Sequence, residues 1–184
     1  RLVDDVPVVG AFPASGVIGI SGSLDHALGT ARGLVAQVAA LHSPAEVVLG
    51  GLFSAEAAAH WDWIKWLPHT TSDAAPVDGP LLATGTSACS ALLAHLRELI
   101  DQRIVDGDPG EGPEAPTPAV VIVVDDAAPV DRSLLVELAE RGRVASVFCI
   151  WVARTVQQLP AAAEVFVDHD PATHQALAGY IDGG

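Results

Sequence analysis

The sequence is poor in basic residues. Lysine and arginine together number 9, against 23 aspartates and glutamates, and the formal net charge is −14. Proteins that bind nucleic acid neutralise its phosphates with clustered lysines and arginines. Anionic lipid headgroups attract the same cations. We therefore expect neither nucleic acid nor a membrane surface among the partners of this segment.

Long apolar runs, a leader peptide and paired cysteines are also lacking. The run VASVFCIWVA at 144–153 is shorter than the roughly 20 residues that span a bilayer, so we expect no membrane insertion by this segment. The start, RLVDDVPVV, lacks the basic and apolar parts of a signal peptide and has no methionine, so we expect a membrane anchor to lie outside the chain. We expect Cys89 and Cys149 to be buried thiols in a reducing compartment.

The residues that are present predict one folded α/β domain over 1–184. Half of the 184 residues are hydrophobic and the mean hydropathy is +0.38, which is enough for a sizeable core. Apolar strands alternate with helices, so we expect a three-layer fold with a mostly parallel sheet and helices on both faces. Strands are expected at 6–10, 16–22, 43–54, 79–87, 119–127, 144–153 and 163–169, and helices at 25–42, 55–67, 88–104 and 131–141.

One segment, DGDPGEGPEAPTP at 106–118, departs from this alternation. It consists almost entirely of glycine, proline and acidic residues, which cannot bury apolar surface. We expect it to be a flexible surface insertion within the single domain.

The stretch GVIGISGSLDHALGTAR at 16–32 has the strand–turn–helix outline of a phosphate loop. A working loop reads GxxxxGK[ST]: its backbone N–H groups surround the phosphates, its lysine offsets their charge and its hydroxyl helps to hold Mg²⁺. Counted from Gly22, the last three positions hold Ala27, Leu28 and Gly29; counted from Gly19, they hold Leu24, Asp25 and His26. Both registers lack lysine, so we predict a helix start capped by Asp25 rather than a phosphate site.

The strand VVIVVDDAAP at 120–129 carries two carboxylates at its end. In ATPases this pattern orients Mg²⁺ and the hydrolytic water; Asp125 would hold the water shell of the metal and Asp126 would polarise the attacking water. Aspartate also commonly ends a strand and starts a turn. A remnant without activity, a working metal site and coincidence all remain open, and we favour the remnant. A degenerate nucleotide site would comprise Gly22, Ser23, Asp25, Asp125 and Asp126.

Three of the 4 tryptophans lie in WDWIKWLPH at 61–69. At helical spacing Trp61 and Ile64 share one face, and Trp63 and Trp66 share another. The helix either packs these rings against the core and the following loop, which we favour, or presents Trp61, Trp63 and Trp66 as an interaction surface. The 7 histidines show no metal-ligand spacing, and neither GxSxG nor GxGxxG occurs, so we expect no metal, no serine nucleophile and no dinucleotide fingerprint.

Taken together, several of these segments resemble EccC, the FtsK/SpoIIIE-type motor protein of actinobacterial type VII secretion. The resemblance is carried by PVVGAF, GVIGISGSLDHALGTARGLVAQVAALHSP, WDWIKWLPH, VVIVVDD and VFCIWVARTVQQLPAAAEVFVDHD, and ALHSP (40–44) and WDWIKWLPH are its most specific parts. The chain looks most like the ATPase-like domain between the membrane anchor and the first standard ATPase domain. Of the motor's site residues, only Asp125 and Asp126 match.

The resemblance implies a P-loop NTPase-like fold without a functional phosphate loop, no catalytic residues and no bound cofactor. It also implies a cytoplasmic domain, attached to the inner membrane through a segment outside this chain. Its partners would be other domains of the motor and other secretion subunits. The predicted function is non-hydrolytic: structural coupling of the membrane pore to the ATPase modules. The alternatives are a divergent ATPase domain that uses Asp125 and Asp126 with a lysine or arginine from a neighbouring domain, and a stand-alone binding module.

Overall fold

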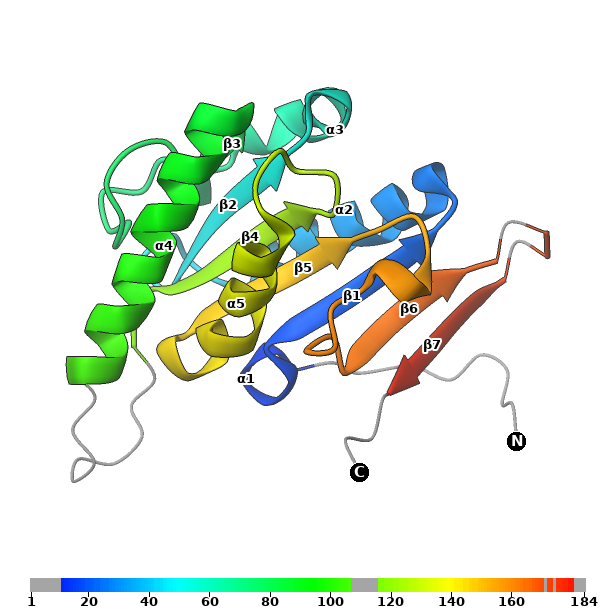
Figure 1. The fold of residues 1–184 in the computed structure, drawn as a ribbon. Coiled ribbons are helices and arrows are strands. Elements are labelled where there is room, and N and C mark those ends of the chain that lie inside the picture. Colours follow the sequence, from blue (N-terminus) through cyan, green and yellow to red (C-terminus); the bar gives the residue numbers. More distant parts are fainter. Residues whose placement is uncertain (1–10, 107–115, 171, 174, 181–184) are drawn as a thin grey trace.

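The protein is built around a seven-stranded sheet with the order β3-β2-β4-β5-β1-β6-β7 (Figure 1). The structure, a computed structural model, describes residues 11–106, 116–170, 172–173 and 175–180. All strand pairs are parallel except β6 with β7. The strands are β1 (Val17–Gly22), β2 (Val47–Phe53), β3 (Leu82–Thr84), β4 (Ala119–Asp125), β5 (Val147–Val152), β6 (Val165–His169) and β7 (Ala176–Tyr180).

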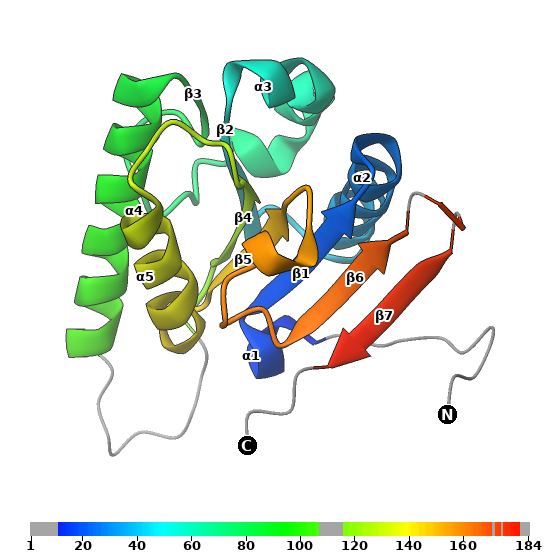
Figure 2. The same ribbon diagram turned by 45° about the vertical axis from the view of Figure 1, so that its right-hand side comes forward.

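Helices cover both faces of the sheet, as the alternation of strands and helices predicts. The α-helices are α1 (Phe12–Ser15), α2 (Leu24–Leu41), α3 (Ala55–Trp61), α4 (Thr86–Asp106) and α5 (Arg132–Gly142). Short 3₁₀ turns are η1 (Asp62–Trp66), η2 (Pro68–Thr70), η3 (Arg143–Ala145) and η4 (Val156–Gln158). α4 and α5 lie on one face, and α2 lies on the other with α3 and η1 (Figure 2). The predicted three-layer α/β class is confirmed.

The central strand β4 shows why the sheet is apolar on both sides. Ile122 and Val124 are buried in the cluster that includes α4 and α5, whereas Val121 and Val123 are buried in the cluster that includes α2. Alternate side chains of a strand point to opposite faces, so a strand covered on both faces reads as a continuous apolar run rather than an alternating one.

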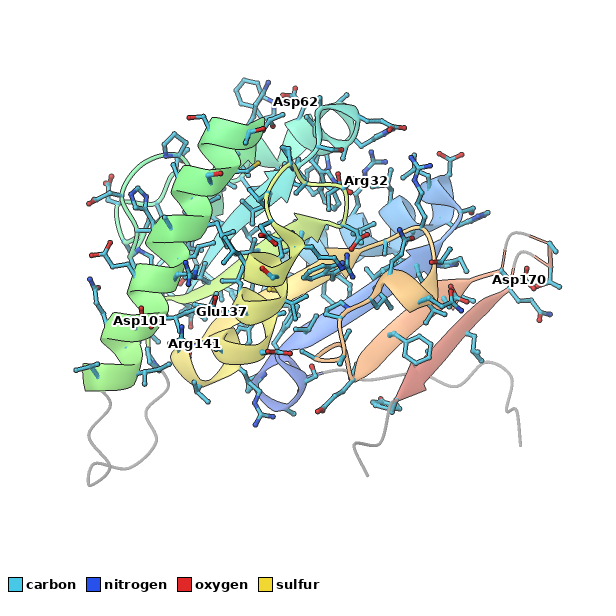
Figure 3. The ribbon with its side chains drawn as sticks, in the orientation of Figure 1. Arg32, Asp62, Asp101, Glu137, Arg141 and Asp170 are labelled. Atoms are coloured by element: carbon cyan, nitrogen blue, oxygen red, sulfur yellow. The ribbon has the colours of Figure 1, made fainter. Side chains whose placement is uncertain are left out.

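An ion-pair network joins α4 to α5 on the surface. Arg141 of α5 contacts Asp101 of α4 and Glu137 of its own helix, and Arg97 of α4 also reaches Glu137 at 3.0 Å (Figure 3). Hydrogen bonds from Arg141 and then from Arg97 hold the pKa of Glu137 below its ordinary value. Such exposed pairs each contribute little to stability, so the buried leucines between the helices carry most of this contact.

Several element boundaries differ from those expected. The helix expected over 55–67 ends at Trp61 and continues as η1, and β5 begins at Val147 because η3 precedes it. The antiparallel strand β7 is missing from the expectations, since its sequence ALAGY contains no β-branched residue. The expected strand at 6–10 lies outside the described residues, as does 107–115 of the expected insertion. Among the described residues, no helix has both the length and the apolar character that crossing a membrane requires.

Candidate nucleotide-site region

The connection between β1 and α2 is a single residue. β1 ends at Gly22 and α2 begins at Leu24, so Ser23 alone joins strand to helix. A phosphate loop surrounds its anion with backbone N–H groups from several consecutive residues. One residue has too little chain to form such a cradle.

The start of α2 also differs from the expected cap. Ser23, not Asp25, is the N-cap residue, and its side chain makes no capping hydrogen bond to the helix backbone. Instead, Ser23 Oγ lies 2.7 Å from His26 Nδ1. Asp25 lies in the first turn, where its negative charge faces the positive end of the helix dipole.

The end of β6 holds this turn in place from the side. Ser21 Oγ donates a hydrogen bond to Asp168 Oδ1 at 2.6 Å, and Thr30 Oγ1 and His169 Nε2 share another at 2.8 Å. Gly22 has φ +115°, and a Cβ placed on it would lie 2.1 Å from the carbonyl oxygen of His169. Burial, followed by the charge of His26, lowers the pKa of His169, and the nearby Asp168 acts in the opposite direction. The rings of His26 and His169 stack with centroids 5.8 Å apart.

Asp125 connects the ends of two neighbouring strands. Its Oδ2 accepts a hydrogen bond from the backbone N–H of Ser54 at 3.0 Å, and its Oδ1 accepts one from the N–H of Ala127 at 3.2 Å. Ser54 is itself the N-cap of α3, with its Oγ accepting from the N–H of Ala57 at 3.1 Å. Both carboxylate oxygens of Asp125 therefore bind the protein's own backbone.

Asp126 has two side-chain partners. Its Oδ1 accepts a hydrogen bond from Trp151 Nε1 at 3.1 Å and forms an ion pair with Arg132. The Arg132 guanidinium lies 5.6 Å from the centroid of the Trp151 ring, a cation–π position. Trp151 is fully buried, so Asp126 satisfies a donor that has no access to water.

A pocket opens at the carboxyl edge of the sheet, where ligands of open α/β sheets bind. Gly22, Asp125 and Asp126 all line it, together with Ser54, whereas Ser23, Asp25 and Thr86 do not. Residues that sequence reasoning missed complete the wall: Glu56, His60, Arg154 and Gln158. Glu56 and Arg154 face each other at 3.5 Å and are both exposed. No short motif marks these residues, because only the folded sheet brings the ends of β4, β5 and α3 together.

The charges of this pocket do not suit a triphosphate. Three carboxylates line it, while its fixed cation, Arg154, pairs with one of them. Arg32 of α2 does not line the pocket, and its Nη2 donates at 2.8 Å to the carbonyl oxygen of the pocket residue His60 (Figure 3). Within the described ranges, no group of three or more histidine, cysteine, aspartate or glutamate side chains is placed to hold a metal ion.

The tryptophans of WDWIKWLPH have three different environments. Trp61 is 2% exposed and stacks on Phe53 with centroids 5.6 Å apart. Trp63 is half-buried and stacks on Trp61 at 6.5 Å. Trp66 is 80% exposed, with the ammonium of Lys65 5.3 Å from the centroid of its ring. The three tryptophans therefore do not form one common exposed surface.

The fold and this pocket define an α/β domain with a mostly parallel sheet and a pocket at its carboxyl edge. No protein-family model matches the chain. In sequence, it is 36% identical over 107 residues to the ESX-4 secretion system protein EccC4 of Mycobacterium tuberculosis, covering 54% of this chain and 9% of that protein. It is 27% identical over 154 residues to the ESX secretion system protein EccC of Geobacillus thermodenitrificans, covering 84% of this chain and 10% of that one.

Two solved structures share the fold of this chain. ATPases 2 and 3 of EssC from Geobacillus thermodenitrificans superimpose with a TM-score of 0.67 at 17% identity, over 88% of this chain and 34% of that one. ATPases 2 and 3 of Thermomonospora curvata EccC, solved in complex with a signal sequence peptide, give 0.57 at 14% identity, over 96% and 34%. The resemblance to EccC-type proteins of type VII secretion is thus confirmed. Since the chain spans at most about a tenth of these curated relatives, its predicted place ahead of the standard ATPase domains stays a prediction.

Proposed function

We propose that this chain is a non-hydrolytic, ATPase-like coupling domain of a type VII secretion motor. In this role it transmits force and position between neighbouring modules through protein–protein contacts and turns over no nucleotide. Its partners are other domains of the same motor and other secretion subunits, and its place is the cytoplasmic side of the membrane, anchored through a segment outside this chain.

The observation that carries the proposal is the one-residue connection at Ser23. Catalysis of phosphoryl transfer consists almost entirely of positioning and charge stabilisation, and both depend on a backbone cradle and a lysine. Here the turn is too short for a cradle and is tied to β6 through Asp168 and His169.

The carboxylates support the same conclusion. Asp125 holds backbone N–H groups of two segments, and Asp126 holds Trp151 and Arg132. A carboxylate that orients Mg²⁺ or water must direct an oxygen at that ligand. In this chain both oxygens of Asp125 and Oδ1 of Asp126 bind groups of the protein itself.

A second candidate is a divergent ATPase domain completed by a neighbour. The observation in its favour is that Gly22, Asp125 and Asp126 line one pocket at the expected edge of the sheet. A lysine or arginine from an adjacent module would have to supply the missing positive charge.

Nucleotide binding separates the two candidates. We expect the melting temperature of the purified domain to be unchanged by Mg-ATP up to millimolar concentration. A ligand present at about 100 times its Kd would stabilise the fold by about 2.7 kcal/mol, a shift of several degrees. Asp125→Asn is the matched variant: a shift in the wild type that disappears in this variant would show a working pocket and overturn the non-hydrolytic assignment. The second candidate, a nucleotide site completed by a cation from a neighbouring module, is tested by ATP turnover of the parent protein with and without the same substitution.

The coupling role requires a separate test in the parent protein. Trp66 is the large aromatic residue most exposed in the described chain, and exposed tryptophans are favoured in binding hot spots. We expect Trp66→Ala to reduce co-purification of other secretion subunits, while Val105→Ala, at an equally exposed apolar residue on α4, leaves it unchanged. Equal recovery with both variants would remove Trp66 from the interface.

A further inference from the structure

The strand β7 ends the sheet with an open edge. It pairs only with β6, and no strand follows it in the order of the sheet within the described part of the chain. Figures 1 and 2 show it at the outer side of the molecule, beyond the helices that cover β1 to β5.

One hydrogen bond determines which main-chain groups of β7 face β6 and which face the open edge. The N–H of Asp170 donates to the carbonyl oxygen of Gln175 at 3.0 Å, and these two residues stand opposite each other in the register that pairs His169 with Ala176. Hydrogen-bonded and non-hydrogen-bonded pairs alternate along antiparallel strands. Leu177 and Gly179 therefore turn their main-chain groups toward β6, and Ala176 and Ala178 turn theirs toward the open edge.

This edge has none of the features that normally prevent strands from pairing. Proteins protect edge strands with lysine, proline or bulges, but the sequence ALAGY contains no charge and no proline. Leu177 is 51% exposed. Beside it, the Phe166 ring covers Gly179, where a Cβ would lie 2.5 Å from the ring. Free main-chain donors and acceptors next to exposed apolar side chains are what strand addition uses.

The negative charge of the domain favours a basic partner strand at this edge. Asp168 on β6 and the exposed Glu164 and Asp170 at the two ends of β6 add to the negative charge of the domain, one strand in from this edge. The whole chain carries a net charge of −14. Two copies paired along β7 would bring two domains of the same large negative charge together, and self-repulsion opposes this. A strand that carries lysine or arginine is attracted instead.

We propose that β7 is a docking edge for an extended segment of a partner protein, in which apolar residues alternate with basic ones. The segment adds to the sheet beyond β7 by hydrogen-bonding to Ala176 and Ala178, and its apolar side chains lie beside Leu177 and Phe166. This inference is independent of whether the chain binds a nucleotide.

Peptides of defined pattern test the proposal. The probe is a fluorescein-labelled peptide of about nine residues, roughly one strand long, in which lysine and valine alternate, and fluorescence anisotropy follows its binding. We expect saturable binding, protection of the Ala178 amide from hydrogen exchange, and at least tenfold weaker binding of the matched glutamate–valine peptide. Absence of binding, or equal binding of the two peptides, would overturn the proposal.

Backbone methylation separates strand addition from attraction by charge alone. The N–H groups of an added strand alternate between facing β7 and facing away. We expect N-methylation of one alternate set to abolish binding and methylation of the other set to leave it unchanged. If the two methylated peptides bind equally well, the contact is only electrostatic and the docking edge is wrong.

A pair of protein variants gives the converse test. Ala178→Pro removes an outward N–H and leaves the bonds to β6, a place where edge strands tolerate proline, whereas Ala178→Ser keeps the N–H. We expect at least tenfold weaker binding for the proline variant and unchanged binding for the serine variant. Analytical ultracentrifugation of the unliganded wild type adds a further check. If the wild type forms dimers and Ala178→Pro does not, a second copy occupies the edge and the proposal is wrong. If Ala178→Pro has a lower melting temperature than the wild type, the N-methylated peptides test strand addition on the wild type instead.

Discussion

Asp126 shows, at the scale of a single residue, how a carboxylate in a catalytic-looking position can be structural. Its Oδ1 accepts from the buried Trp151 Nε1 and pairs with Arg132. Removal of the acceptor leaves the indole N–H buried without a partner, which costs about 1–3 kcal/mol. We expect Asp126→Ala to lower the free energy of unfolding by that amount, and Asp126→Asn, which retains a carbonyl acceptor, to lower it less. Urea unfolding followed by tryptophan fluorescence measures both; equal losses would place the effect in the ion pair with Arg132.

His169 makes stability depend on pH. Burial and the neighbouring His26 lower its pKa below the ordinary value of 6.5 in the folded protein. Between the two pKa values of His169, the unfolded chain binds more protons than the folded protein. The stability that His169 contributes is therefore complete above its pKa in the unfolded chain. It declines as the pH falls below that value and is lost below its pKa in the folded protein. We expect the free energy of unfolding to decrease from pH 8 to pH 5 less steeply in His169→Gln than in the wild type. Parallel curves for the two proteins would show that other histidines cause the dependence.

At the scale of an element, Gly22 at the end of β1 and Gly29 within α2 have opposite roles. Gly22, before the helix, has φ +115° and faces the His169 carbonyl, whereas a Cβ on Gly29 would meet nothing within 4 Å. We expect Gly22→Ala to destabilise the protein by about 1–3 kcal/mol or more, because backbone strain and the clash add. Gly29→Ala should stabilise it by roughly 0.5–1 kcal/mol. Thermal unfolding of both variants against the wild type tests the pair, and a harmless Gly22→Ala would mean that β6 does not close over the turn.

For the whole molecule, two surfaces lie outside the pocket at the carboxyl edge of the sheet. Trp66 projects from η1, which packs with α3 and α2, and the open edge of β7 lies at the end of the sheet beyond β6. With a net charge of −14, both surfaces favour basic partners, and the field of the whole domain would speed their encounter at low salt. These two proposed surfaces, together with the one-residue connection between β1 and α2, fit the proposed role of coupling modules.

The extent of successful prediction differed between the elements. β4 was predictable because both of its faces are buried, so every position from Val120 to Val124 is apolar. β7 was not predictable, because ALAGY contains no β-branched residue and the strand forms where β6 supplies its hydrogen bonds. The helix over 55–67 was predicted too long: α3 ends at Trp61, and the chain continues as the 3₁₀ turn η1, in which Ile64 is buried.

The candidate site, too, was predictable from the sequence only in part. The absence of lysine from both registers of 16–32, the paired carboxylates after β4 and the acidic balance of the chain are all properties of the order of residues. Together with the alternation of apolar strands and helices, they determined the α/β class, the resemblance to secretion motors and the poor match to a phosphate loop. Periodicity and spacing act within one segment, and this information is entirely local.

Only the tertiary structure decided how those residues are used. In the structure, Ser23 alone connects β1 to α2, and the carbonyl oxygen of His169 lies close to Gly22 beside it. The carboxylate of Asp125 binds the N–H of Ser54, and that of Asp126 binds the indole of Trp151. The edge of β7 that includes Ala178 pairs with no described strand. Each of these contacts joins segments that are distant in the chain, and their pairing depends on strand order and burial, which no local pattern encodes. A carboxylate after a strand looks the same whether it holds a metal or an indole, and the partner appears only when the sheet is assembled.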